Sequence, residues 1–327
     1  MRAVLLKEFG APDRMYHGDA PTPVLGRNEV LVKVHATALN RADTLQRKGK
    51  YPPPPGASSI MGLEFAGDVA SLGSDVSSLK VGDRICGLLS GGGYAEYVTI
   101  HEDMSIAMPG EMLYEEAAAI PEVFLTAFQA LSYLAELKED ETVLIHAGAS
   151  GVGTAAIQLA RELGAQDIYV TASAAKHDIC KKLGAGLAID YKSQNFKEVI
   201  LNQTQNKGVD VIVDFMGASY FQKNINSLAQ DGRMVMLAFM GGIQAEVNLA
   251  NILRKRLKIM GSTLRARTLD YKIQLTQDFT KFAMPLFESG AIRPVIDSVY
   301  NWNDVVEAHK HMEANKNKGK IVLKVAD

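Results

Sequence analysis

This chain of 327 residues has few cysteines and little net charge. The two cysteines, Cys86 and Cys180, stand far apart, so they provide neither a disulfide framework nor a metal site of four thiolates. The formal net charge is −2, and a chain with no excess of positive charge lacks the field that attracts nucleic acid. We therefore expect a reducing compartment, the cytoplasm, and no nucleic-acid partner.

Long apolar runs are missing as well. Pro121 and Glu122 interrupt the most apolar region, so no uncharged stretch reaches the length of a transmembrane helix. The apolar run in the first residues, MRAVLLKEFGAPDR, is too short for a signal peptide, and we expect no membrane contact. With 47% hydrophobic and 22% charged residues the composition is that of a globular protein, and the length fits two domains.

The first part of the chain, residues 1–121, contains many short strand patterns separated by glycine and proline. In residues 29–36 (EVLVKVHA) the valines alternate with other residues, so they fall on one face of a strand. Further strands are expected at residues 65–72, 84–88 and 94–100. Short strands at this density are typical of a partly closed β-barrel.

Residues 122–266 instead alternate strand and helix signals. A helix at 123–137 precedes the first of six expected strands, which are separated by helical segments. This alternation predicts a doubly wound parallel sheet, so the fold class is α/β. The tail, residues 267–327, ends in a strand at 320–324, and we expect it to complete the first domain.

A glycine-rich turn joins the first strand of this region to the helix that follows. Residues 142–164 (TVLIHAGASGVGTAAIQLARELG) have the pattern of a buried strand, a turn and an amphipathic helix. This geometry aims backbone N–H groups and the positive end of a helix dipole at an anion, as in dinucleotide sites. The spacing is not G-x-G-x-x-G, so a tight turn in an ordinary βαβ unit is the alternative. The expected cofactor-binding residues of the turn are Gly148, Ser150, Gly151, Val152 and Gly153.

The end of the second strand of the sheet indicates which nucleotide binds. An acid at this position would bind the ribose 2′-hydroxyl of NAD and repel a 2′-phosphate, but no acid occurs before Asp178. Ser173 is able to donate a hydrogen bond to a phosphate and Lys176 adds positive charge, so we predict NADPH. Lys192 could add charge to the same patch. The alternative is a serine that caps a helix, followed by a surface lysine.

Five stretches spread along the chain carry a family resemblance: 38–43 (ALNRAD), 51–58 (YPPPPGAS), 118–122 (AAIPE), 146–159 (HAGASGVGTAAIQL) and 311–317 (HMEANKN). In these stretches the chain resembles the zeta-crystallin-like quinone oxidoreductases of the medium-chain dehydrogenase/reductase superfamily. The resemblance implies a GroES-like barrel domain, a Rossmann domain and NADPH-dependent two-electron reduction of quinones.

The same resemblance implies roles for individual residues. Tyr191 would join Ser173 and Lys176 around the 2′-phosphate, and Asn40 and Tyr51 would face the active site. A homodimer formed by pairing the edge strands of two Rossmann sheets is usual in this group. The residues expected along the cofactor near its nicotinamide are Phe239, Met240, Gly241, Leu264 and Arg265.

Metal ligands are also absent at the positions where related zinc enzymes carry them. The zinc alcohol dehydrogenases of the same superfamily have a cysteine in place of Asn40 and Gly-His-Glu in place of residues 62–64, which are Gly-Leu-Glu here. Their four structural cysteines, expected between residues 97 and 109, are missing. Because a catalytic zinc needs about three soft or borderline ligands, we predict no metal. The histidines His101, His309 and His311 are expected on the surface.

Without a Lewis acid, an acceptor that takes hydride readily is the expected substrate, such as a quinone or an enone. Tyr51 would donate a hydrogen bond to the acceptor oxygen or stack on its ring, unless it only packs on its proline loop. Asn40 would fix the carboxamide side of the cleft, unless it only bonds its own loop. Two other functions stay open, an alkenal or 2-enoyl reductase and a low-turnover NADPH-binding structural or sensing protein. Asp43, expected to be solvated or paired with Arg41, is assigned no role, and neither is Arg267.

Overall fold

The computed structural model describes residues 1–325, and the chain divides into two compact units. Unit 1 contains Met1–Leu125 and the segment that begins at Leu264, and unit 2 is Thr126–Thr263. The boundaries expected from the sequence, after residues 121 and 266, lie a few residues away. Side-chain contacts explain the shift, because Phe124 packs edge-on against Phe287 with 5.0 Å between ring centroids. Arg265 likewise donates to the Gln46 side chain at 2.7 Å.

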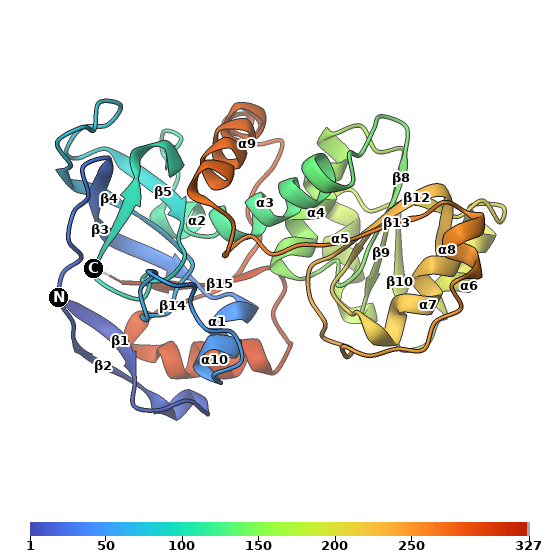
Figure 1. The fold of residues 1–327 in the computed structure, drawn as a ribbon, viewed down its shortest axis with the longest axis horizontal. Helices are drawn as coiled ribbons and strands as arrows, with labels where there is room; N and C mark the ends of the chain where they lie inside the picture. The colour runs from blue at the N-terminus through green and yellow to red at the C-terminus, as the bar shows by residue number, and fades with distance from the viewer. Residues whose placement is uncertain (326–327) are drawn as a thin grey trace. The chain divides into compact units, whose positions relative to one another are not determined.

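Unit 2 is built on a six-stranded sheet whose neighbouring strands all run parallel (Figure 1). The strand order is β10-β9-β8-β11-β12-β13. The first strand, β8, thus lies in the middle of the sheet; β9 and β10 are added on one side of it, and β11, β12 and β13 on the other. This order confirms the predicted doubly wound sheet. Its strands are β8 (Thr142–Ile145), β9 (Asp167–Ala172), β10 (Leu187–Asp190), β11 (Val209–Asp214), β12 (Leu228–Met236) and β13 (Lys258–Gly261). The helices of this unit are α4 (Gly151–Glu162), α5 (His177–Leu183), α6 (Phe196–Gln203), α7 (Ala218–Ser227) and α8 (Ala250–Arg254).

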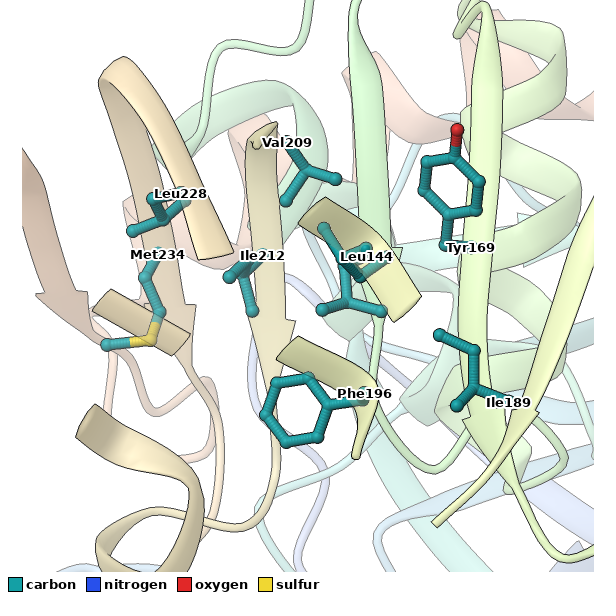
Figure 2. Close-up of a cluster of buried hydrophobic side chains, with 9 residues drawn as sticks. Leu144, Tyr169, Ile189, Phe196, Val209, Ile212, Leu228 and Met234 are labelled. Carbon is teal, nitrogen blue, oxygen red and sulfur yellow. The ribbon is translucent and has the colours of Figure 1, made fainter. Parts of the chain in front are cut away.

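One face of this sheet carries a continuous apolar row. Tyr169, Leu144, Ile212 and Met234 are register partners on successive strands, so their side chains point to the same face. Figure 2 shows them together with Phe196, which comes from α6. Burial of each large apolar side chain contributes about 1.5–3 kcal/mol to folding. The row therefore fixes the strands whose ends carry the predicted nucleotide-binding residues.

Unit 1 is built on a mainly antiparallel sheet that is centred on the long strand β3, and the edge strand β14 runs parallel to its neighbour β15 (Figure 1). The order is β14-β15-β3-β4-β5-β7, and β6 also pairs with β3. Register shifts in the β3·β4 pair bend the sheet, as a partly closed barrel requires. A separate pair, β1 and β2, lies outside it. The strands are β1 (Arg2–Leu6), β2 (Met15–Asp19), β3 (Glu29–Ala38), β4 (Glu64–Leu72), β5 (Arg84–Leu88), β6 (Tyr97–His101), β7 (Ser105–Ala107), β14 (Ile296–Asn301) and β15 (Lys320–Lys324).

The C-terminal tail adds its last strand to the sheet of unit 1. β15 pairs antiparallel with β3, with Val322 opposite Ala38, and this register places Lys320 at the end of β3 where Asn40 follows. Two helices of the tail, α9 (Leu269–Ser289) and α10 (Val305–Glu313), belong to the same unit, as do α1 (Arg41–Arg47) and α2 (Tyr114–Ala117). Residues more than 250 positions apart in the sequence thus become neighbours.

The helix predicted at residues 123–137 is shorter than expected. α3 spans Pro121–Phe128 and continues as a π-helical segment, Gln129–Leu134. Proline at the first helical position is favourable because its missing N–H would have no intrahelical partner there. By length and composition Tyr114–Leu134 would suffice to cross a membrane, but 72% of its most apolar window is buried in the protein, as in a core helix.

Candidate active site

The glycine turn of unit 2 is tightly packed against the sheet. A Cβ atom on Gly153 would lie 2.3 Å from the Ala147 carbonyl oxygen, and one on Gly148 would lie 2.7 Å from Cβ of Val170. Both distances are far below van der Waals contact, so only glycine fits without a shift of backbone or strand. The turn is therefore shaped by the absence of side chains at two positions.

Backbone donors at the start of α4 are available for a ligand. The hydroxyl of Ser150 accepts the N–H of Gly153 at 3.1 Å. Among residues 1–325, no acceptor takes the N–H of Gly151 or of Val152. Two unbonded N–H groups at the positive end of a 12-residue helix suit a phosphate, so these residues fit the pyrophosphate of a dinucleotide.

A buried histidine ties this turn to the neighbouring strand. Nε2 of His146 lies 2.7 Å from the Asn224 amide oxygen, so Nε2 carries the proton, and Nδ1 accepts the Thr171 hydroxyl at 3.0 Å. The hydroxyl oxygen of Thr171 also accepts the N–H of Ala147 at 3.3 Å. The backbone carbonyl oxygen of Thr171 accepts the N–H of Gly148. Burial lowers the pKa of His146, which keeps the ring neutral. No sequence pattern assigned a role to His146, although it immediately precedes the turn.

The residues predicted at the 2′-phosphate come from neighbouring strand ends. Ser173 follows β9 and Tyr191 follows β10, and the two strands are paired at Ala172 and Asp190. The Ser173 side chain does not cap the following turn, Ala174–Lys176, so the alternative of a helix-capping serine does not describe it. The Asp190 carboxylate is held locally, accepting the Lys192 N–H at 3.2 Å and a serine hydroxyl.

The predicted loop after β12 lies at the same edge of the sheet. Met240 donates its N–H to the Phe215 carbonyl at 3.0 Å, and Gly241 donates to Met216 at 2.8 Å, so the loops after β11 and β12 are joined. The side chains of Phe239 and Met240 are about half exposed. Because parallel strands end at one edge, these residues and the glycine turn share the carboxyl edge of the sheet.

In unit 1, Asn40 belongs to a cluster of buried charges. The cluster, which we call the buried polar cluster, consists of the buried residues Asn40, Asp43, Glu64 and Lys320 together with the partly buried Glu122. The Asn40 amide nitrogen donates to Glu64 at 2.7 Å, and Nζ of Lys320 donates to the Asn40 amide oxygen at 2.6 Å. Only 7% of the Asn40 surface is exposed. Its amide thus bonds groups on β4 and β15 as well as its own loop.

Two carboxyl groups of this cluster have strongly raised pKa values. Burial raises the pKa of Asp43 to about 6, although its carboxylate accepts the N–H groups of Asn40 at 2.7 Å and Gly62 at 3.1 Å. The expectation that Asp43 is solvated or paired with Arg41 is wrong, because Asp43 is 0% exposed and its carboxylate is bonded by these two backbone N–H groups. Burial and the neighbouring charge of Glu64 raise the pKa of Glu122 to about 8.

Tyr51 and Arg265 form a pair next to this cluster. The Arg265 guanidinium lies 5.3 Å from the centre of the Tyr51 ring and donates to the Ser90 carbonyl at 2.8 Å and to Gln46 at 2.7 Å. Burial raises the pKa of Tyr51, so its hydroxyl stays a donor, and within residues 1–325 that hydroxyl bonds no other group. Leu264 and Arg265 are buried in unit 1, and their predicted role along the cofactor stays a prediction.

One histidine expected on the surface is fully buried. His309 is 0% exposed on the inner face of α10, where its Nε2 lies 3.2 Å from the Tyr94 hydroxyl. Burial lowers the pKa of His309 to about 3. His101 and His311 are partly exposed. No group of three His, Cys, Asp or Glu side chains in residues 1–325 is placed to hold a metal ion.

Comparisons with known proteins agree with this architecture. Residues 26–110 match the family model of the alcohol dehydrogenase GroES-like domain, and residues 151–288 match that of the zinc-binding dehydrogenases. The human quinone oxidoreductase is 30% identical over 99% of this chain and 97% of its own length. The rat synaptic vesicle membrane protein VAT-1 homolog is 31% identical over 99% and 84%. The Escherichia coli quinone oxidoreductase complexed with NADPH superposes with a TM-score of 0.88 at 28% identity, covering 99% of this chain and all of that one.

Fold, sequence and site together define an oxidoreductase built from a GroES-like barrel domain and a Rossmann domain. The chain belongs to the medium-chain dehydrogenase/reductase superfamily and, within it, to the zeta-crystallin-like quinone oxidoreductases.

Proposed function

We propose that this protein reduces quinones with NADPH, by hydride transfer that needs no metal. The observation that carries the proposal is the Tyr51 hydroxyl, a protonated donor that bonds no other group in residues 1–325 and sits on a loop fixed by Arg265. A quinone that takes up hydride develops negative charge on oxygen, and a positioned hydroxyl stabilises that charge. The donor set of the buried polar cluster, with an ammonium at its centre, also favours chemistry without a metal.

The cofactor proposed is NADPH. The Gly151 and Val152 N–H groups would hold its pyrophosphate, and Ser173, Lys176 and Tyr191 its 2′-phosphate. When bound, the reduced nicotinamide supplies the hydride. A mycobacterial protein complexed with NADPH, 29% identical over 99% of this chain with a TM-score of 0.87, supports the choice.

The side chains of unit 1 would handle the acceptor. Tyr51 donates a hydrogen bond to the acceptor oxygen, and Asn40 contributes to the wall of the same site. Conversion of a quinone and a hydride into a hydroquinone also consumes one proton, and the raised pKa of Glu122 keeps a protonated carboxyl near Tyr51 at neutral pH.

A second activity, reduction of a carbon–carbon double bond, is favoured by the solved structures. The CurK enoyl reductase superposes with a TM-score of 0.86 at 28% identity. For assembly we propose a homodimer through β13, because this strand is an edge of the sheet and Leu249 and Leu253, at the helix that precedes it in the sequence, are largely exposed. We propose the cytoplasm as its location.

The test is steady-state turnover of the purified chain with matched quinones and enones, each with NADPH and with NADH. We expect kcat/KM to be highest for quinones with NADPH and at least about tenfold lower with NADH. The Tyr51→Phe variant should lower quinone kcat by about tenfold at an unchanged KM for NADPH. Enone turnover above quinone turnover would select the enoyl reductase, and tight NADPH binding without turnover would select the structural or sensing function. A monomeric mass of the purified protein in solution would contradict the proposed homodimer.

A further inference from the structure

A single ammonium group lies at the centre of the buried polar cluster. Lys320 is only 3% exposed, and its Nζ donates to the Leu39 carbonyl at 2.8 Å, to the Asn40 amide oxygen at 2.6 Å and to Glu64 at 2.7 Å. An ammonium has three N–H donors, so every one of them is used within the protein. A buried lysine with all its donors satisfied is a built feature, because burial of an unpaired charge is strongly unfavourable.

The three bonds determine how the Asn40 side chain is oriented. Its oxygen faces Lys320, so its nitrogen faces Glu64 at 2.7 Å and the Ala38 carbonyl at 3.4 Å. Glu64 is 0% exposed and accepts three donors: the Asn40 amide, Lys320, and the backbone N–H of Glu122 at 2.8 Å. Lys320, Asn40 and Glu64 thus form a closed triangle in which each residue bonds the other two.

The same ammonium sets the charge balance of the carboxyl groups around it. Burial is the main cause that raises the pKa of Asp43 from α1 and of Glu122 from α3; the negative charge of Glu64 raises both further, and the positive charge of Lys320 lowers both. The other groups facing Glu122 are Tyr51 and Arg265. Arg265 is the other cation that lowers the pKa of Glu122, and the Tyr94 hydroxyl faces Asp43 at 3.4 Å, so removal of Lys320 would leave the carboxyl groups with less positive charge around them.

We propose that Lys320 is the positioning residue of the acceptor site: it fixes the Asn40 amide and balances the carboxyl groups beside Tyr51. This inference rests on the proposed reduction of an acceptor at these residues. It assigns to Lys320 an action through Asn40, Glu64 and Glu122, and no direct contact with the acceptor.

The first experiment compares Lys320→Met with Lys324→Met, a matched substitution on the same strand, in quinone turnover from pH 5 to 10. For Lys320→Met we expect kcat to fall at least about tenfold, with the KM for NADPH unchanged within about twofold. The pH profile should move upward by about one unit, because the charge that lowers the pKa of Glu122 and Asp43 is gone. In the double variant Lys320→Met/Glu64→Gln the pH profile should move back down, because the negative charge of Glu64, which raises the pKa of Glu122 and Asp43, is removed as well. Lys324→Met should behave as the wild type.

An unchanged pH profile in Lys320→Met, with kcat reduced only in proportion to the unfolded fraction, would overturn the inference and leave the proposed function intact. The absence of quinone turnover in the wild type would overturn the proposed function. In that case a double-mutant cycle of Lys320→Met and Glu64→Gln in urea unfolding still tests the triangle. We expect the double variant to lose less unfolding free energy than the two single variants lose in sum. Additive losses would overturn the inference.

Discussion

The two units build their polar sites in opposite ways. At the glycine turn of unit 2 the donors are the backbone N–H groups of Gly151 and Val152, and the turn that carries them packs against β9 and its own backbone only because Gly148 and Gly153 bring no side chain. In the buried polar cluster of unit 1 the polar groups are side chains, and almost all their hydrogen bonds are made inside the protein. One site is made by leaving atoms out, and the other by bringing charges together.

This difference determines what a mutation does at each site. A backbone site is damaged by adding atoms, and the loss appears in ligand affinity. A side-chain cluster is damaged by removing atoms, and the loss appears in orientation, in pKa values and in stability. The predictions below test this contrast, beginning with the largest expected effect.

The first prediction adds a single methyl group to the glycine turn. In Gly153→Ala the new Cβ would meet the Ala147 carbonyl oxygen at 2.3 Å, so the turn must shift away from its N–H geometry. We expect NADPH affinity to fall by about 100-fold, measured by cofactor fluorescence, which corresponds to about 3 kcal/mol. Gly186→Ala is the matched control in unit 2, because its Cβ would have 3.9 Å to the nearest atom. Equal affinities of the two variants would contradict the prediction.

The second prediction restores the acid that the second strand of the sheet lacks. Ser173→Asp would place a carboxylate beside the position proposed for the 2′-phosphate. We expect NADPH affinity to fall by about 30-fold, or about 2 kcal/mol, with NADH affinity nearly unchanged, as measured by titration calorimetry. Ser173→Ala should have a much smaller effect, since it removes one hydrogen bond and adds no charge. An equal loss of affinity for NADPH and NADH would show that Ser173 does not lie at the 2′-phosphate.

The same contrast explains which parts could be predicted from the sequence. The parallel sheet and the glycine turn are local patterns, because a strand, a turn and a helix follow one another within residues 142–164. The buried polar cluster joins β3, β4, α1, α3 and β15, and no local pattern reports that Lys320 meets Asn40. Asp43 looked like a loop acid because burial under the Gly62 loop is a tertiary feature. The signal in the sequence was Lys320, which opens the short strand KIVLK ahead of three apolar residues, although Lys324 closes the same strand.

The third prediction decides to which site Arg265 belongs. The sequence assigns it to the cofactor, whereas its guanidinium bonds Gln46 and Ser90 and lies over Tyr51. We expect Arg265→Met to raise the KM for quinone by about tenfold, because the Tyr51 loop loses its anchor, with NADPH affinity unchanged within about twofold. The exposed Arg267, two residues away, provides the control Arg267→Met. A loss confined to NADPH affinity would return Arg265 to the nucleotide site.

The last prediction concerns stability in unit 1, where a buried histidine and a buried carboxyl group respond to pH in opposite directions. His309 has its pKa lowered to about 3, so the unfolded chain binds the extra proton first, and its contribution to stability is present above about pH 6.5 and lost as the pH falls. Asp43 has its pKa raised to about 6, so its contribution is present at low pH and lost as the pH rises through 6. Between pH 7.5 and pH 5 the two contributions therefore oppose each other.

Replacement of the histidine should leave the carboxyl groups of raised pKa, Asp43 and Glu122, to determine how stability changes in this range. We expect His309→Gln, relative to the wild type, to gain about 2 kcal/mol in unfolding free energy when the pH is lowered from 7.5 to 5, whatever its absolute stability. Urea unfolding followed by the fluorescence of Trp302, the single tryptophan, reports on unit 1 because this buried residue directly precedes α10. The partly exposed His101 gives the control His101→Gln. If His309→Gln and the wild type lose stability in parallel, His309 is not the group that titrates, and the polar interior of unit 1 is less sensitive to pH than its burial implies.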